Sequence, residues 1–187
     1  AHLGMMAEFA ADRGGTLIVD EIYHGLTYGG GCTTMAAVDG VFVINSFSKY
    51  FNMTGWRLGW MVAPERYVPE IDKLAQNIYL AASTPAQYAA LAAFKPETLA
   101  ILDARREEFR SRRDYLVPAL RGVGFDVPCL PQGAFYVYAG CGSLTRDSYA
   151  FARDLLEQAG VAITPGIDFG SNAPHEHVRF AYTNSIE

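Results

Sequence analysis

The chain contains short apolar runs that end on a polar residue, and this pattern restricts the fold more than any other feature. Residues 16–20 read TLIVD and residues 41–45 read VFVIN. Such a run, bounded by turn residues, is typical of a strand buried on both faces of a parallel sheet. A third run, WRLGWMVA, covers residues 56–63, and helical patterns occupy residues 2–13 and the stretch after Pro64. We therefore expect a parallel α/β sheet in the first half of the chain.

The second half of the chain has a different sequence pattern. Residues 96–120 carry a highly charged helical pattern, and short strand-like runs then surround one helix at about 148–159. This change predicts an α/β portion over residues 1–95, a connecting helix over 96–120 and a smaller α+β domain over 121–187.

Charge and composition argue against several classes of function. The net charge is -5. The basic cluster from Arg105 to Arg113 is interleaved with acidic residues, which predicts a solvated helix face and no nucleic-acid partner. No apolar run approaches the ~20 residues of a membrane span. The three cysteines lack metal-ligand spacing, which favours a reducing, cytoplasmic setting and no metal.

The two ends of the chain suggest that the sequence continues beyond them. It opens on an amphipathic helical pattern without an initiator methionine or a clear N-cap, and it stops just after the strand-like residues 178–182. We therefore expect a piece of a longer protein.

Polar side chains follow the first two apolar runs, at the ends where ligands bind in open α/β sheets. Asp20 ends the first run, and Ser46, Ser48 and Lys49 follow the second. Each has an ordinary explanation by itself, because aspartates stabilise turns and lysines beside aromatic rings can still reach water. Together with Arg57, however, Lys49 places two cations in an apolar, glycine-punctuated segment, which predicts an anionic ligand.

The segment SFSKYFNMTGWRLG at residues 46–59 resembles, position by position, the lysine signature of class I/II aminotransferases. These are fold-type I enzymes that depend on pyridoxal 5'-phosphate. VDEIYHGLTY at residues 19–28 is similar to the segment that carries their ring-nitrogen aspartate. Later segments resemble their small domain: PQGAFYVY at 131–138, ITPGIDFG at 163–170 and VRFAY at 178–182. The resemblance covers about the C-terminal half of such an enzyme, so it implies that residues 1–95 belong to the large cofactor-binding domain.

The resemblance implies catalytic roles for three residues. Lys49 would form the internal Schiff base with the cofactor aldehyde and then carry the proton between the substrate Cα and the cofactor. Asp20 would pair with the pyridine nitrogen and keep it protonated. Tyr23 would donate a hydrogen bond to the phenolic oxygen of the cofactor.

The resemblance also implies which residues bind the cofactor phosphate and the substrate carboxylate. Ser46, Ser48 and Arg57 would bind the phosphate, since two hydroxyls and a planar guanidinium suit a dianion. Arg179 would bind the substrate α-carboxylate.

Other candidates are weaker. His24 follows Tyr23 closely and is expected at the cofactor rim. His175 and His177 form an HxH pattern, which predicts a surface loop more than a metal site. Tyr136 and Tyr138 are expected to serve one buried and one exposed face of a strand.

The resulting functional hypothesis is an aminotransferase that moves an amino group between an aspartate-type or aromatic amino acid and a 2-oxo acid. A carbon–sulfur lyase of the same fold and the aminotransferase-like domain of a transcription regulator are the alternatives. The resemblance further implies a homodimer, because active sites of this family borrow residues across a dimer interface.

Overall fold

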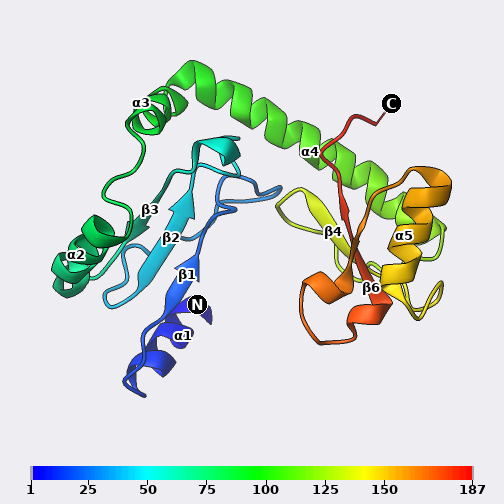
Figure 1. The fold of residues 1–187 in the computed structure, drawn as a ribbon, viewed down its shortest axis with the longest axis horizontal. Coiled ribbons are helices and arrows are strands. Elements are labelled where there is room, and N and C mark those ends of the chain that lie inside the picture. The colour runs from blue at the N-terminus through cyan, green and yellow to red at the C-terminus, as the bar shows by residue number, and fades with distance from the viewer. Residues whose placement is uncertain (1, 187) are drawn as a thin grey trace. The chain divides into compact units, whose positions relative to one another are not determined.

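The computed structural model of the protein describes residues 2–186. The chain divides into two compact units, residues 1–104 and residues 105–187 (Figure 1). No helix among the described residues is long and apolar enough to cross a membrane.

The first unit is built on a three-stranded sheet with the order β1-β2-β3. Its strands are β1 (Ile18–Asp20), β2 (Phe42–Ser46) and β3 (Gly59–Val62). The parallel pairing of β1 with β2 agrees with the parallel sheet expected from the sequence. β3 runs antiparallel to β2, so that expectation is wrong for β3. Residues 47–58 connect β2 to β3 without an α-helix, and such a direct return suits an antiparallel neighbour.

Burial in this sheet is concentrated on the central strand. Val43 of β2 is 2% exposed, while Ile18 of β1 is 64% exposed and all four residues of β3 are exposed. The expectation of strands buried on both faces is therefore wrong for β1 and β3. These are the two edge strands of this sheet, so fewer neighbours cover their side chains. The expectation is also wrong for β2, which is buried on one face only, because Ile44 is 42% exposed.

Three α-helices lie wholly within the described residues of the first unit. They are α1 (His2–Ala11), α2 (Val68–Ile78) and α3 (Thr84–Ala93), with short 3-10 helices at Thr54–Trp56 and Glu65–Tyr67. The small residues Ala90 and Ala93 of α3 pack with Phe47 and Met53, which follow β2. This packing forms one of the apolar clusters of the unit and anchors the segment that carries Lys49.

The long charged pattern forms α4 (Pro96–Gly122), which agrees with the helix expected at 96–120. Its basic cluster is not wholly solvated, because Arg113 is only 5% exposed. The Arg113 guanidinium donates to the carbonyl of Pro131 at 2.6 Å and to the Asp114 carboxylate at 2.8 Å. The prediction of a solvated face thus missed an arginine that binds a backbone carbonyl of the same unit.

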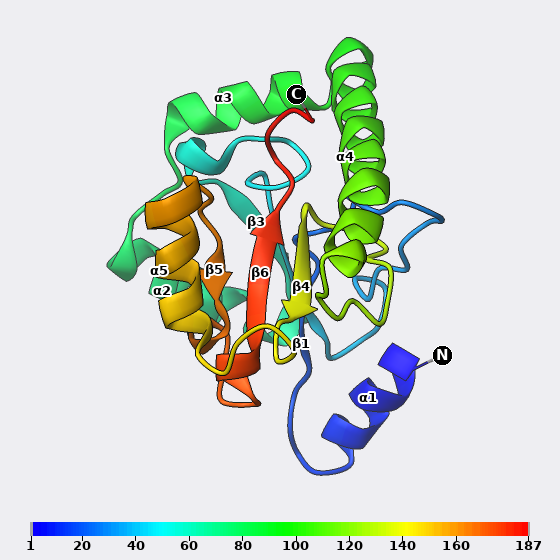
Figure 2. The same ribbon diagram turned by 90° about the vertical axis from the view of Figure 1, so that its right-hand side faces the viewer.

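The second unit contains a three-stranded antiparallel sheet and one further helix (Figure 2). The sheet order is β4-β6-β5, with β4 (Tyr136–Gly140), β6 (His177–Ala181) and β5 (Thr164–Pro165). Asp147 caps the N-terminus of helix α5 (Ser148–Ala159), because its carboxylate accepts hydrogen bonds from two backbone N–H groups. Short 3-10 helices cover Gly166–Asp168 and Pro174–Glu176.

The alternation along β4 and β6 separates a core face from an open face. Val137, Ala139 and Val178 are completely buried. Tyr136 and Tyr138 both lie on the other face, because residues two apart in a strand share a face. The expectation that the two tyrosines serve opposite faces is therefore wrong.

Candidate active site

The signature segment folds into a tight loop between the end of β2 and the start of β3. Phe47 N–H donates to the Leu58 carbonyl at 3.1 Å, and Met53 N–H donates back to the Phe47 carbonyl at 2.9 Å. Asn52 and Arg57 adopt left-handed backbone conformations with φ of 56° and 53°. Asparagine tolerates this region better than most residues, but arginine does not, and such strained positions cluster at functional sites.

Aromatic side chains anchor this loop. The Phe47 ring contacts the rings of Phe51 and Trp60 at centroid distances of 4.9 and 5.0 Å. The Phe51 ring also lies 5.2 Å from that of Phe94, at the end of α3. The aromatic residues around Lys49 thus pack the loop against the core. This packing explains why a segment with a lysine and an arginine contains so many aromatic residues.

Two hydroxyls and a guanidinium lie on this loop. The Ser46 and Ser48 hydroxyl oxygens are 2.8 Å apart, and Ser48 N–H donates to the Ser46 hydroxyl at 3.0 Å. Thr54 links them to the arginine, because its hydroxyl donates to the Ser48 carbonyl at 2.6 Å and its carbonyl accepts from Arg57 Nη1 at 3.0 Å. Within residues 2–186, Arg57 forms no ion pair, so its positive charge has no acidic partner there.

The ends of β1 and β2 bring the other predicted residues to the same region. Asp20 is in register with Ile44, two residues before Ser46. One Asp20 carboxylate oxygen accepts a hydrogen bond from Ile22 N–H at 3.0 Å, which fixes the turn after β1. The Lys49 amine lies 5.7 Å from the centroid of the Tyr23 ring. Strand pairing thus places Asp20 beside the strand that leads to Ser46, and Lys49 lies near Tyr23.

Glu21 is a residue that the sequence reasoning missed. It is 5% exposed, and its carboxylate accepts hydrogen bonds from Met35 N–H at 2.7 Å and the Thr34 hydroxyl at 2.8 Å. His24 Nδ1 lies 3.2 Å from the same carboxylate, so His24 also stabilises the turn after β1. A buried carboxylate with such partners fixes the segment that presents Asp20 and Tyr23. The only sequence signal was a second acid next to Asp20, at the end of an apolar run.

Gly25 and Tyr50 join this turn to the signature loop. The Tyr50 hydroxyl donates to the Asp103 carboxylate of α4 at 2.7 Å, and the face of its ring packs on Gly25. A Cβ atom at Gly25 would lie 2.6 Å from Tyr50 Cγ, and its φ of +90° is a conformation that favours glycine.

Gly25→Ala is therefore expected to lower the free energy of unfolding of this chain by about 2–6 kcal/mol, since overpacking and backbone strain each cost about 1–3 kcal/mol. Urea unfolding of the two proteins measures the difference. Gly31→Ala is the matched control, because nothing lies within 4 Å of its Cβ position. Equal stability of the two variants would contradict the close packing on Tyr50.

Arg179 lies in the second unit, in the middle of β6. Its Nη2 donates to the Thr164 hydroxyl at 3.4 Å, and it forms no ion pair within the described residues. It is half-buried, so its guanidinium can still reach an anion.

The remaining candidates in this unit do not form a reactive centre. His175 is exposed, and the His177 ring stacks on Tyr138 at a centroid distance of 5.1 Å. Residues 2–186 contain no group of three or more histidine, cysteine or acidic side chains that could hold a metal. Burial raises the pKa of the Cys141 thiol, and the nearby Glu176 raises it further. That thiol therefore stays protonated at neutral pH, which disfavours a nucleophilic role.

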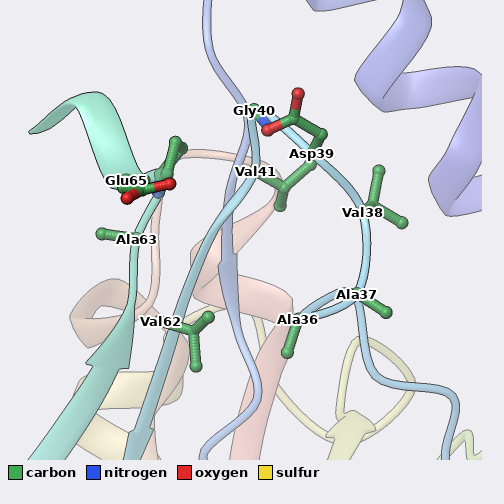
Figure 3. A pocket seen from close by; sticks show the side chains of 10 residues that line it. Ala36, Ala37, Val38, Asp39, Gly40, Val41, Val62, Ala63 and Glu65 are labelled. Atoms are coloured by element: carbon green, nitrogen blue, oxygen red, sulfur yellow. The ribbon is translucent and has the colours of Figure 1, made fainter.

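A pocket of about 280 Å³ lies at the other end of the first sheet (Figure 3). Its lining comes from the segment before β2, which includes Asp39, and from the segment at the end of β3, which includes Glu65. The residues that line it include two carboxylates and no lysine or arginine, so it does not suit an anionic cofactor. Ser46 lies at the opposite end of β2.

The donor set at the carboxyl ends of β1 and β2 fits the functional groups of pyridoxal phosphate. The two hydroxyls and Arg57 suit the phosphate, Lys49 suits the aldehyde, and the Asp20 carboxylate suits a protonated ring nitrogen. Asp20 and Arg57 are exposed and hence accessible to a ligand.

A family model described as aminotransferase class I and II matches residues 1–186. The valine–pyruvate aminotransferase of Mycobacterium tuberculosis is 42% identical over 169 residues, which are 89% of this chain and 44% of that protein. The aspartate/prephenate aminotransferase of Thermus thermophilus is 34% identical over 189 residues, 99% of this chain and 48% of that protein.

Solved structures agree with these relatives. The crystal structure of an aminotransferase from Mycobacterium tuberculosis superposes with a TM-score of 0.89 at 39% identity, over 96% of this chain and 47% of that one. The chain thus spans about half the length of the curated relatives that it matches.

Proposed function

This chain belongs to the class I and II aminotransferase family, and from that premise we propose that it forms part of an enzyme that transfers an amino group between an α-amino acid and a 2-oxo acid. We further propose that it acts within a polypeptide of its relatives' length, called the full-length protein below. The observation that carries the proposal is the loop that holds Lys49 with Ser46, Ser48 and Arg57, next to Tyr23.

Pyridoxal phosphate would supply an electron sink for the bond that is broken at the substrate Cα. Lys49 would attach it covalently and, once released by the incoming amino group, move the Cα proton. Asp20 would hold the proton on the ring nitrogen, and the Tyr23 hydroxyl would donate to the phenolic oxygen. Ser46, Ser48 and Arg57 would bind the phosphate.

Arg179 would bind the α-carboxylate of the substrate. Its planar fork of N–H donors matches a carboxylate, and within the described residues its charge has no acidic partner.

The substrate is proposed to be an aspartate-type or aromatic amino acid. The names of the relatives, which include aspartate/prephenate, valine–pyruvate and aromatic-amino-acid aminotransferases, define a first panel of aspartate, valine and the aromatic amino acid phenylalanine. Transfer from one of these to a 2-oxo acid, measured as formation of the new amino acid, would support the proposal. Release of pyruvate and ammonia from a sulfur-containing substrate, with no new amino acid, would instead indicate a carbon–sulfur lyase.

We also propose that the full-length protein is a cytoplasmic homodimer. Its large domain would include residues 1–95, and residues 96–120 would connect that domain to a small domain that begins at residue 121. Light scattering tests the assembly, and an active monomer would contradict it.

Arg57→Ala is expected to weaken cofactor binding by the full-length protein about 10- to 100-fold, because a hydrogen bond to a charged group contributes about 1.5–3 kcal/mol. Titration of apoprotein with pyridoxal phosphate gives the dissociation constant. Arg66→Ala is the control, because that exposed arginine packs over Tyr67 and lies outside the proposed site. The same weakening in both variants would argue against phosphate binding by Arg57.

A further inference from the structure

The open face of the second sheet surrounds Arg179 with aromatic rings. Strand pairing sets Tyr138 of β4 and Thr164 of β5 directly opposite Arg179 on the central strand β6. Because paired residues share a face, and so do residues two apart, Tyr136 lies on this face as well. Phe169 follows the short helix Gly166–Asp168 and reaches the same group.

Two of these rings contact the guanidinium directly. Arg179 Cζ lies 4.7 Å from the centroid of the Phe169 ring and 5.4 Å from that of Tyr136. The Tyr138 ring packs edge-on against Phe169 at 5.7 Å and 84°, and so supports that ring from the side. Partial burial raises the pKa of the Tyr138 hydroxyl, and a smaller contribution from Cys141 acts in the same direction, so Tyr138 stays uncharged at neutral pH.

Aromatic rings and carboxylates bind an arginine side chain differently. A carboxylate partner would occupy the N–H fork, whereas an aromatic face attracts the cation and leaves its donors available. Arg179 uses one of its five donors, in the long contact to Thr164, and forms no ion pair within residues 2–186.

We propose that Phe169 and Tyr136 are positioning residues that clamp the Arg179 guanidinium and keep its donor fork oriented for the carboxylate of the substrate. The proposal rests on the assignment of Arg179 to that carboxylate. The clamp lowers the conformational entropy that the arginine loses on binding and therefore acts on substrate affinity, not on the bond that is broken.

Phe169→Leu in the full-length protein tests the clamp. Leucine keeps an apolar side chain but removes the ring, so KM for the amino acid is expected to rise about 5- to 30-fold while kcat stays within about twofold. Phe169→Tyr keeps the ring and is expected to retain the KM of the unmodified protein. An unchanged KM in Phe169→Leu, a loss in kcat with KM constant, or equal KM changes in the two variants would overturn the proposal.

A binding measurement separates this proposal from the proposed function. Calorimetric titration with propionate, an unreactive carboxylate, needs no turnover, and Phe169→Leu is expected to raise its dissociation constant by the same factor. If the unmodified protein transfers no amino group from any substrate, the proposed function fails and this titration alone decides about the clamp. Equal dissociation constants for the unmodified protein and Phe169→Leu would overturn the clamp even in an active aminotransferase.

Discussion

Replacing Lys49 with alanine in the full-length protein is expected to reduce amino-group transfer by at least about 10²–10⁴-fold, the range that a positioned acid–base group contributes. The loss of covalent attachment adds to this reduction, because the same amine is assigned both roles. The loop around Lys49 is held by the aromatic cluster of Phe47 and Phe51, so the substitution removes the amine without removing an anchor of the core. Steady-state assays of transfer measure the effect.

Lys73→Ala is the matched control, since Lys73 is an exposed lysine on α2 and its removal should leave transfer unchanged. Borohydride reduction provides an independent readout, because it fixes the cofactor to the residue that holds it. The chain has three lysines, Lys49, Lys73 and Lys95, so peptide mapping distinguishes them clearly. Label on Lys73, Lys95 or any other lysine of the full-length protein, or transfer by Lys49→Ala within tenfold of the unmodified protein, would refute the assignment.

The sequence was sufficient to propose the residues of the candidate site because the chemistry expected there demands particular residue types at short range. Ser46, Ser48, Lys49 and Arg57 lie within twelve residues of one another, so a local pattern captures them. Asp20 was proposed because an acid at the end of an apolar run predicts the edge of a sheet where ligands bind. These residues could be proposed without knowledge of the tertiary structure.

Contacts between distant segments could not be predicted in the same way. The carboxylate of Glu21 is satisfied by residues 13 and 14 positions away, and the Tyr50 hydroxyl binds Asp103, which is 53 positions away. Nothing in the local pattern indicates such partners. The direction of β3 was missed for a related reason, since an apolar run has the same appearance in a parallel and an antiparallel strand.

Exposure was the least predictable property, because it depends on what packs against a strand. The run that contains β3 has the composition of a buried strand, yet all four residues of β3 are exposed. Conversely, Arg113 belongs to a charged pattern typical of a solvated helix, but it is buried against the Pro131 carbonyl. In both cases the neighbours decide the burial, and the composition of the segment does not.

Asp20→Asn in the full-length protein is expected to lower turnover about 10³-fold while cofactor binding is largely retained. An ion pair near a protein surface contributes about 4 kcal/mol at ~4 Å and an effective dielectric constant of ~20, and each 1.36 kcal/mol changes a rate tenfold. Asparagine keeps an oxygen that can accept from Ile22 N–H, as Asp20 does at 3.0 Å, so the turn survives and only the charge is removed. Turnover and cofactor titration are measured on the same preparation.

Asp39→Asn is the control for this prediction. Asp39 lies in the pocket at the opposite end of the sheet, so replacing its carboxylate with an amide should leave turnover unchanged. Retained cofactor binding in Asp20→Asn is essential to the interpretation, since Lys49 and the phosphate ligands are untouched and should still hold the cofactor. If turnover fell only together with cofactor affinity, Asp20 would act in binding and not through the ring nitrogen. If turnover stayed near normal, another group would have to keep that nitrogen protonated, and the carboxylate at the end of β1 would serve only to stabilise its turn.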